Sequence, residues 1–80
     1  MSDTIQRLKA IISSTGLSRS TIYLRITKRV FTKPVSLGGR AVGWPASEVA
    51  ALKAAWIAGE SEAEVRDLVG RLEAARKLTK

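Results

Sequence analysis

The chain has 80 residues, with 14 lysines and arginines, seven aspartates and glutamates, and neither cysteine nor histidine. This length allows one domain with a small core. The missing residue types exclude disulfides and thiol nucleophiles, remove the usual metal ligands, and leave no side chain that ordinarily titrates near neutral pH. We therefore expect a binding protein without metal or cofactor, and not an enzyme.

The excess positive charge is confined to the first half of the sequence. Residues 4–47 contain eight basic side chains and no carboxylate, whereas residues 48–80 contain six of each sign. A uniformly basic small domain is typical of a surface that lies against a polyanion, and we expect duplex DNA. No apolar run approaches the roughly 20 residues that span a bilayer, and the first residues are not a charged leader. We expect no membrane partner and a location in the cytoplasm, on the DNA of the cell.

A short first helix is predicted over residues 8–14. Leu8, Ile11 and Ile12 recur at spacings i, i+3 and i+4, which places them on one helical face. Ile5 either extends this helix or forms a short strand before it. We expect the apolar face to pack on the rest of the domain.

Signals for a second helix follow at once. Gly16 supplies the positive φ that ends a helix with little strain, and Ser18 is a preferred N-cap. Leu17 and Ile22 have the spacing of a hydrophobic staple across that cap. Two short helices joined by a glycine-containing turn form a helix-turn-helix.

The second helix is expected from residue 19 to residue 28 or 29. Ile22 and Ile26 form its buried stripe, which Val30 would extend by one turn. The opposite face has no carboxylate and resembles the surface that a helix inserted in a DNA groove presents, although an ordinary solvated polar face is the alternative. The predicted DNA-binding residues of this helix are Ser18, Arg19, Ser20, Thr21, Tyr23, Leu24, Arg25, Thr27 and Lys28.

The pattern then changes to two short strands around Gly38-Gly39, which predicts a β-hairpin. With a two-residue turn, Leu37 would face Arg40 and Val35 would face Val42. The inward face would then carry Val35, Leu37, Val42 and Trp44. Arg40 would stand at the tip, where a guanidinium suits the phosphate backbone or the minor groove; the alternative is a surface arginine that covers a tryptophan. The predicted DNA contacts of this wing and its flank are Lys33, Ser36, Gly38, Gly39 and Arg40.

A third helix is predicted to begin with Pro45 and to end at Gly59. Its apolar stripe consists of Val49, Leu52, Ala55 and Trp56. Both tryptophans, Trp44 and Trp56, have core spacing, and we expect them in the core and not as stacking platforms for single-stranded bases.

The last segment is predicted to be a charged helix with a narrow apolar seam. Ser61 and Glu64 form a capping box at its start, and Gly70 weakens its middle. The seam either folds back on the domain or packs on another subunit. We expect a DNA-binding domain over residues 1–59 and an amphipathic helix over residues 60–80. Self-association would involve Val65, Leu68, Leu72 and Ala75.

Together these elements predict a mainly α fold with a small β-hairpin: a winged helix-turn-helix followed by a C-terminal helix. Three motifs, in consistent order over about residues 5–58, carry a family resemblance. They are GLSRSTIY at residues 16–23, FTKPVSLGGRAVGW at residues 31–44 and SEV at residues 47–49. These motifs resemble the AlpA-like family of phage and mobile-element regulators, whose members are similar to the MerR-type winged helix and to excisionases.

The resemblance implies a transcriptional regulator or a recombination directionality factor, which bends or coats attachment-site DNA so that a tyrosine integrase excises the element. We expect the excisionase role, with a regulator of promoter repeats as the alternative, and both can coexist in one protein. Since one recognition helix and one wing contact few base pairs, several copies are expected to bind side by side. The remaining alternative is a protein-interaction adaptor whose basic face meets an acidic partner.

The sequence departs from the family pattern in the second helix and just after it. The family usually has Arg before Leu, whereas Leu24 here precedes Arg25, which turns Leu24 outward toward a thymine methyl and leaves Arg25 to reach a phosphate from the edge of the core. The family also tends to have Gly near position 29 or 30 and Pro at position 32, where this chain has Arg29, Val30 and Thr32. The segment after Gly59 lies outside the resemblance.

Overall fold

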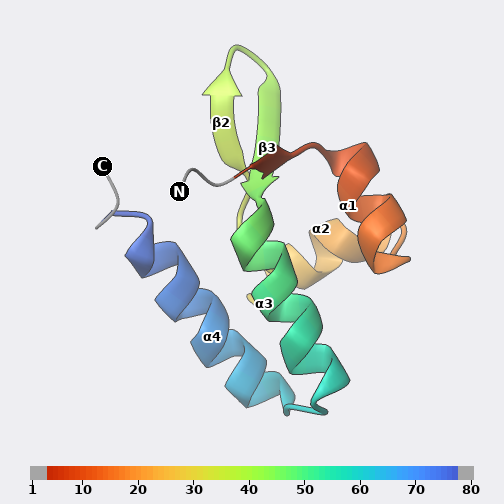
Figure 1. Cartoon of the computed structure of the whole chain (residues 1–80), viewed down its shortest axis with the longest axis vertical. Coiled ribbons are helices and arrows are strands. Elements are labelled where there is room, and N and C mark those ends of the chain that lie inside the picture. The colour runs from red at the N-terminus through yellow and green to blue at the C-terminus, as the bar shows by residue number, and fades with distance from the viewer. Residues whose placement is uncertain (1–3, 78–80) are drawn as a thin grey trace.

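In a computed structural model of the chain, residues 4–77 are described. They form β1 (Ile5–Gln6), α1 (Leu8–Thr15), α2 (Arg19–Thr27), β2 (Val35–Gly38), β3 (Ala41–Pro45), α3 (Ala46–Ile57) and α4 (Glu62–Ala75). The three strands make an antiparallel sheet in the order β1-β3-β2. The hairpin of β2 and β3 projects from one end of the helical body (Figure 1). The architecture is the expected winged helix-turn-helix with a C-terminal helix.

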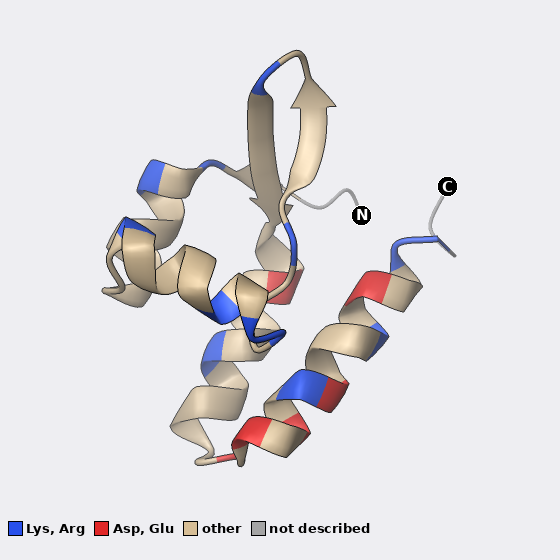
Figure 2. Ribbon diagram, turned by 180° about the vertical axis from the view of Figure 1, so that it is seen from behind, with Lys and Arg blue, Asp and Glu red and all other residues tan. Residues whose placement is uncertain are grey.

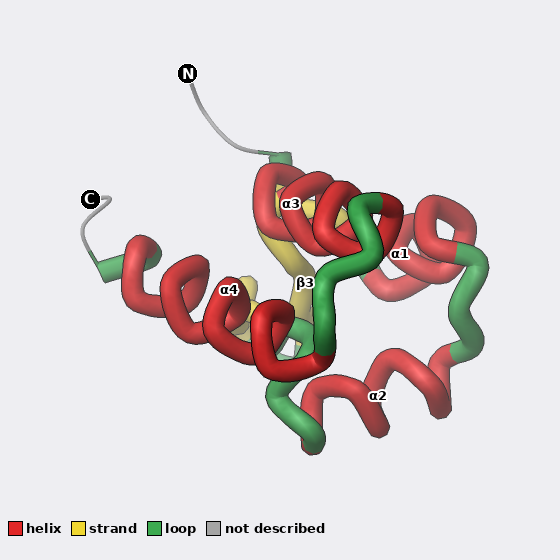
Figure 3. The backbone as a smooth tube through the Cα atoms, turned by 90° about the horizontal axis from the view of Figure 1, so that it is seen from below, coloured by secondary structure: helices red, strands yellow, loops and turns green. Residues whose placement is uncertain are grey.

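The four helices lie in two layers. Helix α3 lies between α1 and α4, and α2 lies behind this layer in the view of Figure 1, as Figure 3 shows from below. Strand β1 pairs with β3 and links the N-terminal segment to the hairpin, with Ile5 opposite Pro45 and Gln6 opposite Trp44. The short strand at Ile5 is the second of the two predicted alternatives. The hairpin is therefore anchored to the body through β1.

The turn between α1 and α2 has the predicted caps. Gly16 has φ 75°, and its N–H donates to the carbonyl oxygen of Ile12 at 2.9 Å. Ser18 caps α2, because its Oγ accepts a hydrogen bond from the Thr21 N–H at 3.2 Å. These short-range contacts fix the angle at which α2 leaves the turn.

Helix α2 ends earlier than the apolar pattern indicates. Its last residue is Thr27, and Arg29 follows with φ 64°. The Val30 N–H donates to the carbonyl oxygen of Arg25 at 2.9 Å, which is the long bond of a Schellman motif. Val30 is buried, but the prediction that it continues the helical stripe is wrong, because the chain reverses direction at Arg29. The left-handed conformation of Arg29 explains why the family pattern tends to have a glycine near this position, since glycine adopts that conformation without strain.

The wing pairs in a different register from the predicted one. The partners across the hairpin are Val35 and Gly43, Ser36 and Val42, and Gly38 and Ala41. Leu37 is an extra residue in a β-bulge, and the two-residue turn consists of Gly39 and Arg40. The predicted Gly38-Gly39 turn, with Leu37 opposite Arg40 and Val35 opposite Val42, is therefore wrong. A bulge shifts the pairing, and the alternation of apolar and polar residues does not reveal it.

The bulge divides the apolar side chains of the wing between both faces of the sheet. Trp44 is fully buried on the face toward the helices, and Val42 is half-buried on that face. Leu37, 44% exposed, lies on the other face, where a Cβ atom at Gly43 would stand 3.4 Å from Leu37 Cδ1 and 2.5 Å from Ile5 Cγ2. The prediction of one inward face shared by Val35, Leu37, Val42 and Trp44 is wrong. Gly43 is required because Ile5 lies directly over it.

A single core joins the helices and the sheet. Its buried members are Ile11, Ile22, Val30, Phe31, Trp44, Val49, Leu52, Ala55, Val65 and Val69. The ring of Trp44 makes edge-on contacts with Phe31 and Tyr23, at centroid distances of 6.2 and 6.5 Å. Trp56 is half-buried and packs against this core. Both tryptophans lie at positions that support packing, as expected.

Helices α3 and α4 form an antiparallel pair (Figure 1). Pro45 is the N-cap of α3, one residue earlier than its predicted place inside the helix, because it still pairs in β3. Gly59, with φ 77°, follows the end of α3. The capping box at Ser61 and Glu64 is present in both directions, at 2.8 and 3.2 Å. Helix α4 thus folds back on the domain.

The apolar seam of α4 contacts the core of the same chain. Val65 and Val69 are 4% and 3% exposed, and Leu68 and Leu72 are half-buried against the core. Val69 was not part of the predicted seam, and it replaces Ala75, which is exposed. The predicted segment 60–80 includes residues 78–80, which lie outside the described residues, as do residues 1–3 of the predicted first domain.

Candidate nucleic-acid interface

The eight basic residues within residues 4–47 lie at the N-cap of α1, on α1, on α2, in the linker at residues 28–34 and in the wing (Figure 2). They are Arg7, Lys9, Arg19, Arg25, Lys28, Arg29, Lys33 and Arg40. Within residues 4–77, none of them is in an ion pair: the three ion pairs all take their cations from α4 and its C-cap. The acidic residues among residues 4–77 lie on α3, on α4 and in the turn between them. The first half of the molecule therefore carries uncompensated positive charge.

The outward face of α2 brings together four of the nine residues predicted for DNA contact on this helix. Ser20 and Thr27 are exposed, Leu24 is 54% exposed and Tyr23 is 37% exposed. The expectation that Leu24 points outward is confirmed. An exposed leucine on a basic helix offers an apolar contact for a thymine methyl in the major groove.

Several hydroxyl groups of α2 are engaged within the helix. Ser18 Oγ accepts from the Thr21 N–H and donates to Thr21 Oγ1 at 2.9 Å, and Thr27 Oγ1 donates to the Tyr23 carbonyl oxygen at 3.1 Å. The side chain of Ser20 makes no hydrogen bond within residues 4–77. Ser20 is therefore better placed than Ser18 or Thr27 to reach DNA.

Arg25 lies apart from the outward set. Its guanidinium carbon is 5.1 Å from the centre of the Trp56 ring, which is a cation–π contact with the core edge. This contact contributes about 0.5–1 kcal/mol at an exposed site, and Arg25 would give it up to reach a phosphate. The structure thus gives Arg25 a role in packing in addition to its predicted DNA contact.

The wing places Arg40 at the exposed tip of the hairpin, beside Gly38 and Gly39, whose φ values are 103° and 56°. Ser36 is exposed, but its Oγ accepts a hydrogen bond from the Gly38 N–H at 3.4 Å inside the bulge. Leu37, which the sequence did not single out as a surface residue, is exposed next to the tip. The bulge that exposes it leaves no signal in the sequence pattern.

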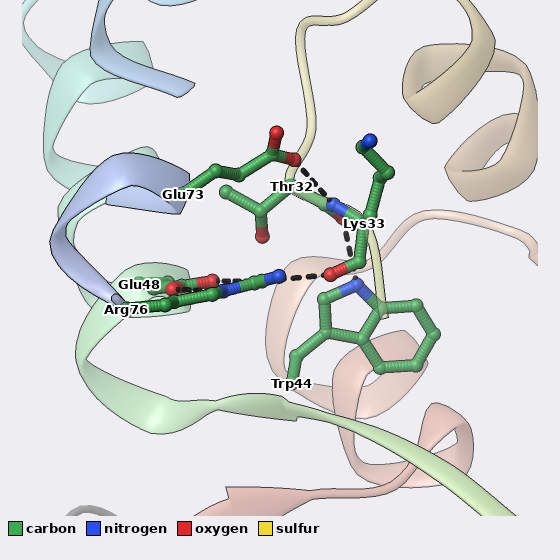
Figure 4. Close-up of polar contacts among 6 residues, drawn as sticks. All are labelled: Thr32, Lys33, Trp44, Glu48, Glu73 and Arg76. Atoms are coloured by element: carbon green, nitrogen blue, oxygen red, sulfur yellow. Dashed lines mark hydrogen bonds and ion pairs between the residues drawn. The ribbon is translucent and has the colours of Figure 1, made fainter. Parts of the chain in front are cut away.

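The linker contains Lys28 and Lys33. Its backbone is bound by side chains that the sequence did not identify as functional (Figure 4). Glu73 Oε2 accepts from the Lys33 N–H at 2.8 Å, and Arg76 Nη2 donates to the Lys33 carbonyl oxygen at 2.7 Å. The Trp44 Nε1–H donates to the Thr32 carbonyl oxygen at 2.9 Å. These partners are 12 to 43 residues apart in sequence, so no local signal could have found them.

Arg76 is held in turn by Glu48. Its Nη2 and Nε donate to the two carboxylate oxygens at 2.6 and 2.7 Å, and Glu48 is only 4% exposed. The hydrogen bonds to Glu48 raise the pKa of Arg76 above its ordinary value, against a smaller opposing effect of burial. A permanently charged, bidentate guanidinium therefore joins α3, the end of α4 and the linker.

Residues 4–77 contain neither a candidate metal site nor a helix that could span a membrane. No group of three or more acidic, histidine or cysteine side chains could hold a metal ion. None of the helices in that range combines the length and apolar character that a membrane crossing requires.

Comparison with known proteins shows that most of the chain matches one protein family. The family described as "Prophage CP4-57 regulatory protein (AlpA)" matches residues 4–66. The chain belongs to the AlpA family. The matched range covers the helix-turn-helix, the wing, α3 and the start of α4, and it ends before Glu73 and Arg76.

One relative of this AlpA family protein is the "Uncharacterized protein ORF88" of Enterobacteria phage P4, which is 51% identical over 53 residues. The aligned part is 66% of this chain and 60% of the relative, so the chain spans less than two thirds of that protein. No solved structure matches the chain. The family is thus described as regulatory, and this relative is a phage protein.

The predicted self-association residues differ in availability. Val65 lies in the core of its own chain, so a second copy cannot contact it without local unfolding. Leu68 and Leu72 are half-buried, and Ala75 is exposed. The apolar seam is thus used mostly within the chain.

Proposed function

We propose that the protein binds duplex DNA with α2 in the major groove and with the wing against the neighbouring backbone or minor groove. The observation that supports this proposal is the run of cations over α1, α2, the linker and the wing, none of which is ion-paired within residues 4–77. Phosphate groups would supply the missing negative charge. Arg19 and the N-terminal amides of α2 can hold one phosphate, since Ser18 leaves the first amides of the helix open.

The outward face of α2 would recognise the DNA sequence. Ser20 and Leu24 present a hydroxyl and an apolar side chain, which suit a base edge and a thymine methyl, respectively. We expect Leu24→Ala to weaken binding to the preferred site more than binding to random duplex. Equal losses on both DNAs would show that Leu24 does not contact a base.

The proposed role is that of an excisionase that binds attachment-site DNA cooperatively and assists a tyrosine integrase. A second candidate is a promoter regulator, which the description of the family as regulatory favours. Both roles use the same DNA-binding surface, and both need several copies on neighbouring sites because one copy contacts few base pairs. An excision assay with the integrase of the same element, run beside a promoter-repression assay, separates them.

The experiment that tests DNA recognition is selection from a random duplex library at near-physiological salt, followed by sequencing of the bound DNA. We expect enrichment of a short motif repeated at a fixed spacing. Retention without enrichment would contradict sequence-specific binding and indicate coating of DNA. No retention would contradict the proposed function and favour a protein-interaction adaptor.

A further inference from the structure

The linker between the recognition helix and the wing has little regular structure of its own. Residues 28–34 contain no helix or strand, and they begin with the chain reversal at Arg29. Because α2 and the hairpin approach DNA as separate elements, their mutual placement depends on how this segment is held. The middle of the linker is held by the core, because Val30, Phe31 and Thr32 are buried, whereas Lys28 and Lys33 near its two ends are exposed. Without further contacts, these ends would let the wing move relative to α2.

Side chains of α4 and its C-cap hold both ends of the linker. At the first end, Arg66 Nε donates to the Lys28 carbonyl oxygen at 3.3 Å. At the second end, Lys33 is bound through both of its backbone groups, by Glu73 at the N–H and by Arg76 at the carbonyl oxygen (Figure 4). The backbone of Lys33 therefore has a fixed position and a fixed orientation relative to α4.

Arg76 is rigid enough for this task because Glu48 binds Nε and one N–H of Nη2. The buried carboxylate binds the guanidinium through two parallel hydrogen bonds, and the remaining Nη2 donor direction faces the Lys33 carbonyl oxygen. A planar fork with fixed hydrogen bonds keeps the orientation that a flexible lysine would lose. Glu48 lies in the first turn of α3, directly after β3. The same contact therefore also fixes the position of the linker relative to the base of the hairpin.

We propose that α4 is a strut that, in addition to the pairing of β1 with β3, fixes the placement of the wing relative to α2, with Arg76 and Glu73 as its positioning residues. Neither residue is predicted to touch DNA; each acts through the backbone of Lys33. Both lie beyond residues 4–66, the range that matches the family, whereas Glu48 and Arg66 lie inside it. The consequence for DNA binding rests on the proposed function, whereas the placement of the wing does not.

The first test measures placement without DNA. The chain has no cysteine, so Ser20→Cys and Arg40→Cys give one spin-label pair, with one label on α2 and one at the wing tip. We expect a narrow distance distribution in this labelled protein, and a broader or shifted one after Arg76→Met or Glu73→Gln. The matched control is Arg71→Met, because Arg71 is an exposed arginine of α4 that pairs only with Asp67 on its own helix.

Folding is checked by circular dichroism at the labelling temperature. If Arg76→Met does not fold, Arg76→Lys serves instead, because it keeps the charge beside Glu48 but cannot bind Glu48 bidentately and reach Lys33 at once. A distance distribution that stays unchanged in a folded Arg76 variant would overturn the proposal.

The second test asks whether placement matters for binding. Arg40→Ala is expected to weaken duplex binding about tenfold in the otherwise unmodified chain, as for one charge-assisted contact. In the Arg76→Lys background the same change should weaken binding less than about threefold, because the wing tip is no longer held against DNA. A merely structural role of Arg76 would leave the two losses equal, and that result would overturn the link to binding. Failure of the unmodified chain to bind duplex would contradict the proposed function, while the spin labels would still decide the placement of the wing.

Discussion

The basic residues in the two halves of the molecule differ in how many of them form ion pairs. In residues 4–47, the cations have no ion-pair partner within the described chain, and seven of the eight are exposed. In residues 48–77, three of the five basic side chains, Arg66, Arg71 and Arg76, each have a carboxylate partner, whereas Lys53 and Lys77 are in no ion pair within the described residues. Uncompensated like charges repel one another in the free protein, so this charge is better explained by an external polyanion than by stability. The comparison separates a surface for binding from a support for structure.

The largest expected loss of stability comes from removing Arg76, which supports the linker. Arg76→Met leaves Glu48 buried without its cation and removes the hydrogen bond to Lys33. Removing one partner of a buried pair costs roughly 3–5 kcal/mol, and we expect about 2–3 kcal/mol here because a quarter of the Arg76 side chain is accessible to water. Thermal unfolding should then begin at least about 8 °C lower in a domain of this size. Arg71→Met is the control, with an expected loss below about 1 kcal/mol; equal losses would contradict the distinction.

A smaller effect on stability is expected at Thr32, in the linker. Thr32 is fully buried, and its Oγ1 has no hydrogen-bond partner among the described residues. Thr32→Val replaces the hydroxyl by a methyl group of similar size and removes an unsatisfied polar group, so we expect a gain in unfolding free energy of about 1–2 kcal/mol. Chemical denaturation measures this gain. Thr32→Ser, which keeps the hydroxyl and loses the methyl group, should destabilise the protein. A loss of stability in Thr32→Val would contradict this account, because it would show that the hydroxyl has a partner.

Gly70 offers a gain of similar direction in α4. It lies in the interior of the helix, is exposed, and a Cβ atom there would meet no atom within 4 Å. Gly70→Ala should therefore stabilise the protein by about 1 kcal/mol through helix propensity alone, without changing its charge. An unchanged midpoint in urea would mean that α4 contributes little to the global unfolding transition.

The smallest effect on stability is expected in the basic half. Arg40→Ala should change the unfolding free energy by less than about 0.5 kcal/mol, since the side chain is exposed at the hairpin tip. The same change should reduce the slope of log affinity against log salt by about 0.9 if one phosphate contact is lost. An unchanged slope would remove Arg40 from the interface, and a large loss of stability would break the comparison between the halves.

The features that could be predicted from the sequence are those specified over a few residues. The Gly16 reversal, the Ser18 cap and the capping box from Ser61 to Glu64 act over one helical turn, and all three are present. The outward position of Leu24 follows from helical periodicity in the same way. These local signals were sufficient to predict the winged helix-turn-helix.

The features that could not be predicted depend on distant contacts or on an irregularity. The bulge at Leu37 changes the register of the wing without changing the residue pattern. The contact of Glu48 with Arg76 spans 28 residues, and that of Lys33 with Arg76 spans 43. A charged residue at the start of a helix looks the same whether it faces water or a buried guanidinium, so burial of Glu48 required the fold.

The central claim is that the unpaired cations of residues 4–47 form a surface for nucleic acid. Its most direct test is the affinity of the full chain for a random-sequence duplex, measured from about 50 to 200 mM salt. Several phosphate contacts predict a straight line of log affinity against log salt with a slope more negative than about −3, at roughly 0.9 for each contact. A slope near zero, or no measurable binding at the lowest salt, would contradict the claim.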